Sequence, residues 1–142
     1  SDLKNSLVEL FFESIIQNEL FQKAYESSPI LAPIPLQRKR LNKRGYNHSQ
    51  LLAKGLAVKL NLETFNVLSR VKETKSQFGL TLKDRKQNIQ DAFSLNTSYP
   101  ILNTNILLVD DILTTGSTLL EAARILKKSG IKKVWGLTLA RD

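Results

Sequence analysis

ILLVDDILTTGST, from Ile106 to Thr118, is the stretch that decides the fold of this chain. Four aliphatic residues lead into two adjacent carboxylates, Asp110 and Asp111, and a loop of small residues with one glycine follows. A continuous apolar run is typical of a strand that is buried on both faces of a parallel sheet. Because open parallel sheets bind their ligands beyond the carboxyl ends of the strands, we expect the acidic pair to lie at a ligand site.

The segment after the acidic pair predicts an anion site at the start of a helix over residues 117–128. We expect Ser117 or Thr118 to cap this helix and Gly130 to end it. Backbone N–H groups at a helix N-terminus attract anions, and Gly116 lets the backbone approach a ligand closely. The loop therefore favours a phosphate, whereas the carboxylates favour hydroxyl groups or a cation. A sugar phosphate with free ring hydroxyls satisfies both together with Mg²⁺.

The rest of the chain alternates between strands and helices. The pattern predicts strands at 30–34, 65–71, 91–95, 105–111 and 132–140, and helices at 2–26, 49–62 and 117–128. Residues 72–88 are polar and basic, which indicates a mobile loop with a short helix near its end. The alternation predicts an α/β domain with a mostly parallel sheet flanked by helices, and Trp135 is expected in its core. We assign residues 1–28 to an N-terminal helical segment packed on this domain, which spans residues 29–142.

Composition restricts the class of protein. The 142 residues contain no cysteine, which excludes disulfides and thiolate zinc sites within the chain and fits a reducing compartment. No apolar run approaches the length of a membrane span, so a cytoplasmic protein without membrane insertion is predicted. The chain also contains no methionine, and we therefore expect that an N-terminal part is missing.

The net charge of +8 is unevenly distributed. Residues 1–28 hold two basic and five acidic side chains, a sum of −3, whereas residues 29–142 hold nineteen and eight, a sum of +11. A strongly basic body indicates an anionic partner, which could be a phosphate, a nucleic acid or an acidic surface. Five basic residues gather within seven positions: Arg38, Lys39, Arg40, Lys43 and Arg44. This basic loop suits a pyrophosphate and also suits DNA.

A second group of lysines flanks the predicted end of the last helix. The group consists of Lys127, Lys128, Lys132 and Lys133. Positive charge is favourable at a helix C-terminus, so solvated charge is the first interpretation of these lysines and a DNA-binding patch is the second.

These motifs resemble a known family. ILLVDDILTTGST is similar to the thirteen-residue signature of type I phosphoribosyltransferases, which bind phosphoribosyl pyrophosphate (PRPP). The stretch 33–57 and a spaced set of later residues resemble the ComF competence family, and the match covers most of residues 29–141. The later set is Arg70, Lys72, Thr74, Gln77, Leu80, Arg85, Asn88, Ala92 and Phe93. Members usually have an N-terminal cysteine zinc module, which has either been removed from this chain or lost in its branch.

The resemblance implies a role for each part of the site. Asp110 and Asp111 would hold the ribose hydroxyls and favour a Mg²⁺ ion beside them. Residues of the small loop would surround the 5′-phosphate: Thr114, Thr115, Gly116, Ser117 and Thr118. The basic loop after Pro35 would meet the pyrophosphate through charge-assisted hydrogen bonds. Residues 71–88 would form a flexible hood that closes over the site. The matching residues of the hood are Arg70, Lys72, Thr74, Gln77, Arg85 and Asn88.

Three functions remain open at this point. The chain is a phosphoribosyltransferase with an unknown acceptor, a non-catalytic PRPP sensor on the same fold, or a DNA-binding adaptor, and the family resemblance implies uptake or processing of transforming DNA. The expected partners are PRPP, single-stranded DNA bound without sequence preference, and other competence proteins.

Thr114 stands where some purine phosphoribosyltransferases have a proton-transferring carboxylate, so we do not expect that role in this loop. His48 is assigned to hydrogen bonding rather than to base catalysis.

Overall fold

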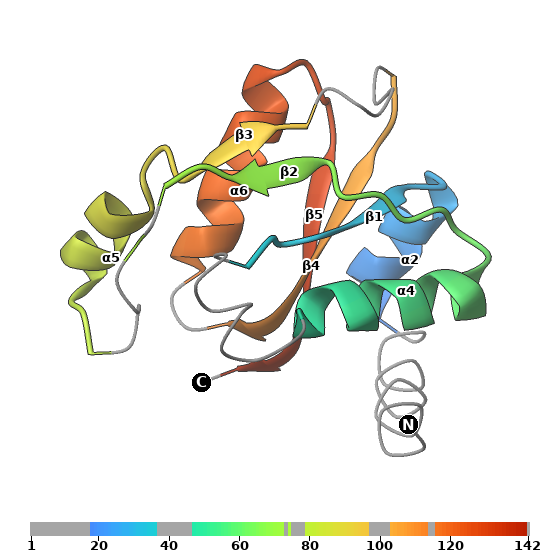
Figure 1. The fold of residues 1–142 in the computed structure, drawn as a ribbon. Helices are drawn as coiled ribbons and strands as arrows, with labels where there is room; N and C mark the ends of the chain where they lie inside the picture. Colours follow the sequence, from blue (N-terminus) through green and yellow to red (C-terminus); the bar gives the residue numbers. More distant parts are fainter. Residues whose placement is uncertain are drawn as a thin grey trace.

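The computed structural model describes residues 18–36, 47–72, 74, 79–96, 103–113 and 116–141 (Figure 1). The predicted helix before residue 18, the basic loop, Gln77, Thr114 and Thr115 lie outside this range. The elements are α2 (Glu19–Glu26), β1 (Ile30–Pro33), α4 (His48–Leu60), β2 (Leu68–Arg70), α5 (Leu82–Ile89), β3 (Phe93–Leu95), β4 (Ile106–Leu113), α6 (Ser117–Lys128) and β5 (Val134–Arg141). None of these helices is long and apolar enough to cross a membrane.

A parallel sheet with the order β1-β4-β5 forms the centre of the molecule. Ile106 of β4 pairs with Ile30 of β1 on one side and with Val134 of β5 on the other. The apolar run therefore forms the central strand, and the prediction of a buried parallel strand at this position is confirmed. The predicted fold class, an α/β domain with a mostly parallel sheet flanked by helices, is confirmed.

Successive side chains of β4 enter two different cores, because neighbouring residues of a strand point to opposite faces. Ile106 and Leu108 pack in a core that includes residues of α6, β2 and β3. Leu107 and Val109 pack in a second core with residues of α4 and with Phe21 of α2. All four side chains are buried. Burial on both faces explains why this strand is continuously apolar.

The second sheet departs from the single alternation that the sequence predicted. β2 and β3 are each three residues long and pair with one another in antiparallel orientation. The chain between them makes an excursion, after which β3 returns antiparallel beside β2. The predicted short helix within this excursion is α5, which begins after Thr81, whose side chain accepts a hydrogen bond from the N–H of Asp84.

Two further expectations concern the margins of the sheet. Trp135 is only partly buried, not fully in the core, because the described part of the sheet places no strand on the far side of β5. Within the N-terminal segment, Phe21 is buried and the Tyr25 hydroxyl donates a hydrogen bond to the carbonyl of Leu60 at 3.0 Å. The division into residues 1–28 and 29–142 stays a prediction.

Candidate functional site

The acidic pair lies at the carboxyl end of the central strand. Asp110 and Asp111 lie among the last four residues of β4, which continues to Leu113, and Asp110 pairs with Thr138 of β5. β1 ends beside it, since the N–H of Ile34 bonds to the carbonyl of Val109 at 2.9 Å. The three parallel strands therefore bring the two carboxylates to one edge of the sheet, where ligands of such sheets bind.

The N-terminus of α4 lies against this edge. Asn47 caps the helix by accepting a hydrogen bond from the N–H of Gln50, and its side-chain amide donates to the carbonyl of Ile34 at 3.2 Å. Asn47 thus fixes the start of α4 beside the end of β1. The positive end of the helix dipole near the acidic pair favours negative charge there.

Two side chains of the first α4 turn contact the carboxylates directly. The hydroxyl of Ser49 donates a hydrogen bond to Oδ1 of Asp110 at 3.3 Å. Nδ1 of His48 lies 3.7 Å from Oδ2 of Asp111. The predicted polar role of His48 therefore has a definite partner, although its catalytic or structural nature stays a prediction.

Burial, followed by the neighbouring carboxyl of Asp111, raises the pKa of Asp110 from 3.8 to about 7. The hydrogen bonds from the N–H of Asp111, at 2.9 Å, and from Ser49 oppose this rise. Ionisation of both carboxyls of the pair is therefore unfavourable near neutral pH. A cation or a set of hydroxyl donors beside Asp110 would favour its ionised form.

The start of α6 differs from the prediction. Gly116 occupies the N-cap with φ +81° and supplies no side-chain cap, while Ser117 is the first helical residue and is buried. The predicted cap by Ser117 or Thr118 is therefore wrong. The reason is the left-handed backbone that joins β4 to α6, which glycine adopts without the steric cost of a Cβ. A helix start without a side-chain cap suits an anionic ligand.

Arg70 lies in β2 and connects three segments. Its Nη1 donates to the carbonyl of Pro35 at 3.3 Å, and its Nη2 donates to the hydroxyl of Thr74 at 2.8 Å. Its Cζ lies 5.0 Å from the centre of the Phe93 ring, within the range of a cation–π contact. Arg70 thus joins the strand to the start of the basic loop and to the predicted hood.

The other described hood residues belong to α5 or hold its end. Arg85 and Asn88 are half-buried residues of α5, and the side chain of Ile89, one residue further, is buried. Lys72 is exposed, and its Nζ donates to the carbonyls of Gln87 and Gln90 at 3.4 and 3.2 Å. The flexibility of the hood stays a prediction.

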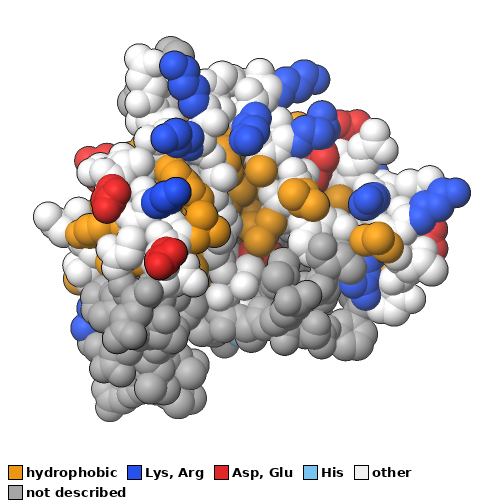
Figure 2. All heavy atoms as spheres, turned by 180° about the vertical axis from the view of Figure 1, so that it is seen from behind, with side chains coloured by type: hydrophobic (Ala, Val, Ile, Leu, Met, Phe, Trp, Pro, Cys, Tyr) orange, Lys and Arg blue, Asp and Glu red, His pale blue; other side chains and the backbone are white. Residues whose placement is uncertain are grey.

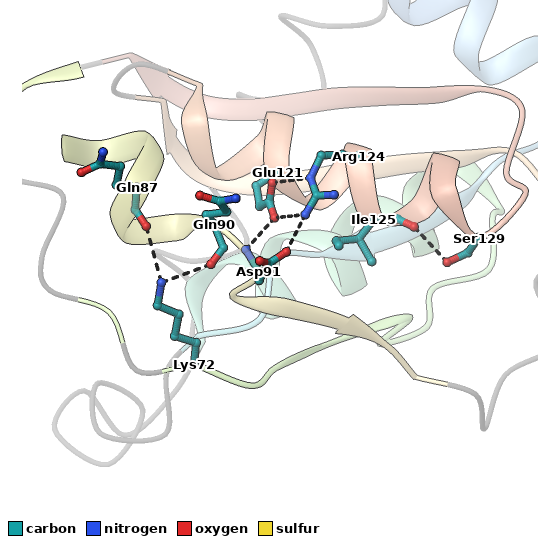
Figure 3. A network of polar contacts seen from close by, with 8 residues as sticks. All are labelled: Lys72, Gln87, Gln90, Asp91, Glu121, Arg124, Ile125 and Ser129. Atoms are coloured by element: carbon teal, nitrogen blue, oxygen red, sulfur yellow. Dashed lines mark hydrogen bonds and ion pairs between the residues drawn. The ribbon is translucent and has the colours of Figure 1, made fainter. Parts of the chain in front are cut away.

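A network of charges holds the end of the excursion on α6 (Figure 3). The buried carboxylate of Glu121 receives two hydrogen bonds from Arg124, both at 2.7 Å, and one from the N–H of Asp91 at 2.8 Å. Arg124 also bonds to the carboxylate of Asp91 at 2.8 Å. Asp91 has φ +56°, so the network fixes an uncommon backbone turn between α5 and β3. The helix that Gly116 precedes as N-cap therefore also fixes the base of the predicted hood.

Sequence reasoning missed Asn47, Ser49 and the Glu121–Arg124 pair. Asn47 had a local signal, because Asn followed three residues later by Gln resembles a capping box. The contact between Ser49 and Asp110 joins residues far apart in the chain, and no local pattern indicates it. Arg124 and Glu121 stand three residues apart on α6, which permits an ion pair but does not indicate Asp91 as its partner.

Comparison with known proteins identifies relatives of this arrangement. The phosphoribosyl transferase domain family matches residues 42–142. The chain is 43% identical over 116 residues to Competence protein F of Haemophilus influenzae, covering 78% of this chain and 50% of the relative. It is 33% identical over 129 residues to DNA utilization protein YhgH of Salmonella typhi, covering 87% of this chain and 56% of the relative.

A solved structure shows the same fold. The allosteric regulatory enzyme of purine biosynthesis superposes with a TM-score of 0.57 at 17% identity, covering 96% of this chain and 25% of that chain. The likeness at this identity shows the fold alone. The chain spans about half the length of the curated relatives that it matches.

Proposed function

The chain belongs to the phosphoribosyl transferase domain family, in its ComF branch, and from this membership we propose that it binds PRPP with Mg²⁺ and serves in uptake or handling of transforming DNA. One observation supports the ligand most strongly. The acidic pair Asp110–Asp111 and the helix start at Gly116 belong to one strand–loop–helix unit at the carboxyl edge of the sheet. A ribose with a 5′-phosphate offers hydroxyl groups to the acidic pair and an anion to the helix start.

Each part of PRPP has a proposed contact. Asp110 and Asp111 accept hydrogen bonds from the ribose hydroxyls, and residues 114–118 surround the 5′-phosphate. The basic loop, Arg38 to Arg44, meets the pyrophosphate. Arg70 supports this arrangement because it bonds to Pro35, where the chain leaves β1 toward that loop.

The residues present fit Mg²⁺ as an ion shared with the ligand. Mg²⁺ is commonly held by one or two carboxylates together with substrate phosphates and water. Asp110 and Asp111 can supply carboxylate oxygens, directly or through water. The side chains that the structure describes contain no group of three His, Cys, Asp or Glu residues that could hold the ion alone. Mg²⁺ therefore fits as part of a PRPP complex rather than as a resident metal, and it would neutralise charge on the pyrophosphate.

Transfer and sensing are the two proposed uses of this site. A transferase would displace pyrophosphate from the ribose by an acceptor, whose identity the residues do not indicate. The absence of a carboxylate at Thr114 favours a PRPP sensor as the second candidate. Release of pyrophosphate in the presence of amine and nucleobase acceptors separates the two.

The biological role is proposed from the relatives. Their names, Competence protein F and DNA utilization protein, support a function in competence, with DNA and other competence proteins as partners. The proposed location is the cytoplasm, which suits a chain without cysteine.

A calorimetric titration with PRPP, with and without Mg²⁺, tests the proposed ligand. We expect Mg²⁺-dependent binding, and we expect the double substitution Asp110→Asn and Asp111→Asn to abolish it without unfolding the protein. The amides keep the size of the side chains but lose the charge that favours a cation. The matched control replaces the exposed Glu26 and Glu63 with Gln, which removes the same charge far from the pair. Unchanged affinity in the Asn variant would refute the assignment of the acidic pair.

A further inference from the structure

The turn between α6 and β5 presents four lysines: Lys127, Lys128, Lys132 and Lys133. We call this group the lysine turn. All four side chains are exposed, and no ion pair joins any of them to a carboxylate within the described part of the chain. The sequence from residue 122 to residue 141 contains six basic and no acidic residues. The charge of the lysine turn is therefore not neutralised by the segment that holds it.

The backbone that holds these lysines is fixed on both sides. The N–H of Ile131 bonds to the carbonyl of Leu126 at 3.2 Å, and the N–H of Gly130 bonds to that of Lys127 at 3.1 Å. With Gly130 at φ +102°, these two bonds form a Schellman motif, and the accompanying apolar contact is supplied by the buried Leu126 and Ile131. The carbonyl of Lys133 accepts a hydrogen bond from the N–H of Ile106 at 3.1 Å. The lysines thus extend from a pre-organised turn, which lowers the entropic cost of binding a partner.

The lysine turn lies at the opposite edge of the sheet from the acidic pair. Lys133 immediately precedes β5, whereas Asp110 pairs with Thr138 five residues further along that strand, about 17 Å away at ~3.3 Å per residue. Figure 2 shows Lys and Arg side chains along the top of the molecule, the end at which β5 begins in Figure 1. A ligand on the lysine turn is therefore separate from a ligand on the acidic pair.

The chemistry of this surface favours a phosphate chain over a protein partner. Protein interfaces gain most of their energy from buried aromatic and apolar anchors. Between residues 127 and 133 the one large apolar side chain is Ile131, which is buried. The carboxylates of Glu121 on α6 and of Asp91 are paired with Arg124. A surface of unneutralised point charges without apolar anchors suits the regularly spaced charges of a nucleic acid backbone.

We propose that the lysine turn is a phosphate-backbone contact for single-stranded DNA, separate from the carboxyl-edge site. The lysines neutralise phosphates and release counterions, so binding is independent of base sequence and weakens with salt. Because the two sites lie at opposite edges, binding at the lysine turn does not compete with a ligand at the acidic pair.

The test uses the fluorescence anisotropy of a labelled oligothymidylate of about 30 nucleotides over a salt series. One variant replaces Lys127, Lys128, Lys132 and Lys133 with Gln. A matched control replaces four exposed lysines elsewhere, Lys23, Lys54, Lys83 and Lys86, and has the same net charge. We expect the turn variant to lose about tenfold or more in affinity near 0.1 M salt, with a logarithmic salt slope shallower by about 2 to 3. The control should change much less.

Several outcomes would overturn the proposal. The first is an equal loss of affinity for the oligonucleotide in the turn variant and in the control. The second is no binding of the oligonucleotide by the unaltered protein at low salt. The third is tighter binding of polyglutamate than of the oligonucleotide, which would indicate an acidic protein partner. Circular dichroism of both variants checks that the fold is intact. The calorimetric titration with PRPP is independent of this measurement, so failure of PRPP binding and failure of the lysine turn are recognised separately.

Discussion

At the scale of the residue, Asp110 is a carboxylate whose burial opposes stability. Its pKa is raised from 3.8 to about 7, so the folded state binds a proton that the unfolded state has released. The stability that the protonated Asp110 contributes to the folded state is fully present below about pH 3.8 and is lost as the pH rises through about 7. We predict that Asp110→Asn stabilises the protein at about pH 8 by ~2 kcal/mol and has little effect at about pH 4. Urea unfolding at both pH values measures the difference. The exposed Glu63→Gln is the control, expected within about 0.5 kcal/mol, and an equal effect of Asp110→Asn at both pH values would contradict the prediction.

At the scale of the element, α6 connects the helix start at Gly116 with the base of the predicted hood. Glu121 and Arg124 hold the N–H and the carboxylate of Asp91, immediately after α5. We predict that Glu121→Gln lowers the free energy of unfolding by about 1–3 kcal/mol, because a buried charge-assisted pair is replaced by weaker bonds. Arg124 lowers the pKa of Glu121, so this contribution is present above the unfolded pKa of 4.5 and is lost as the pH falls through the lower folded pKa.

Hydrogen exchange supplies the specific readout for this element. Amides of α5 should exchange faster in Glu121→Gln, since the end of α5 loses its attachment to α6, while amides of α4 should keep their rates. Arg124→Lys keeps the charge but cannot form the two parallel bonds, so an intermediate effect is expected. Uniform acceleration across both helices would indicate global destabilisation and would contradict the local role of the network.

The sequence predicted those elements that are determined by residues within the same segment of the chain. The run from Ile106 to Val109 indicated a strand buried on two faces, and Gly130 indicated the end of α6. The antiparallel pairing of β2 and β3, the contact between Ser49 and Asp110, and the partial exposure of Trp135 depend on which segments meet in space. The role of Gly116 in letting the backbone approach a ligand stays a prediction, and its left-handed conformation as the N-cap of α6 was not expected from the sequence.

At the scale of the whole molecule, the two basic groups differ in their distance from the acidic pair, and this difference predicts how PRPP affects DNA binding. The basic loop is expected beside the pyrophosphate, so PRPP with Mg²⁺ should displace DNA from it, whereas the lysine turn lies at the opposite edge. Replacing Arg38, Lys39 and Arg40 with Ala should make the salt slope for single-stranded DNA shallower by about 2, at ~0.7 per neutralised phosphate. The DNA binding that remains should then be insensitive to PRPP. In the lysine-turn variant, by contrast, saturating PRPP should remove most of the residual binding. Anisotropy titrations of both variants with and without PRPP test this division, and the same PRPP effect in both variants would show that the two basic groups form one DNA site.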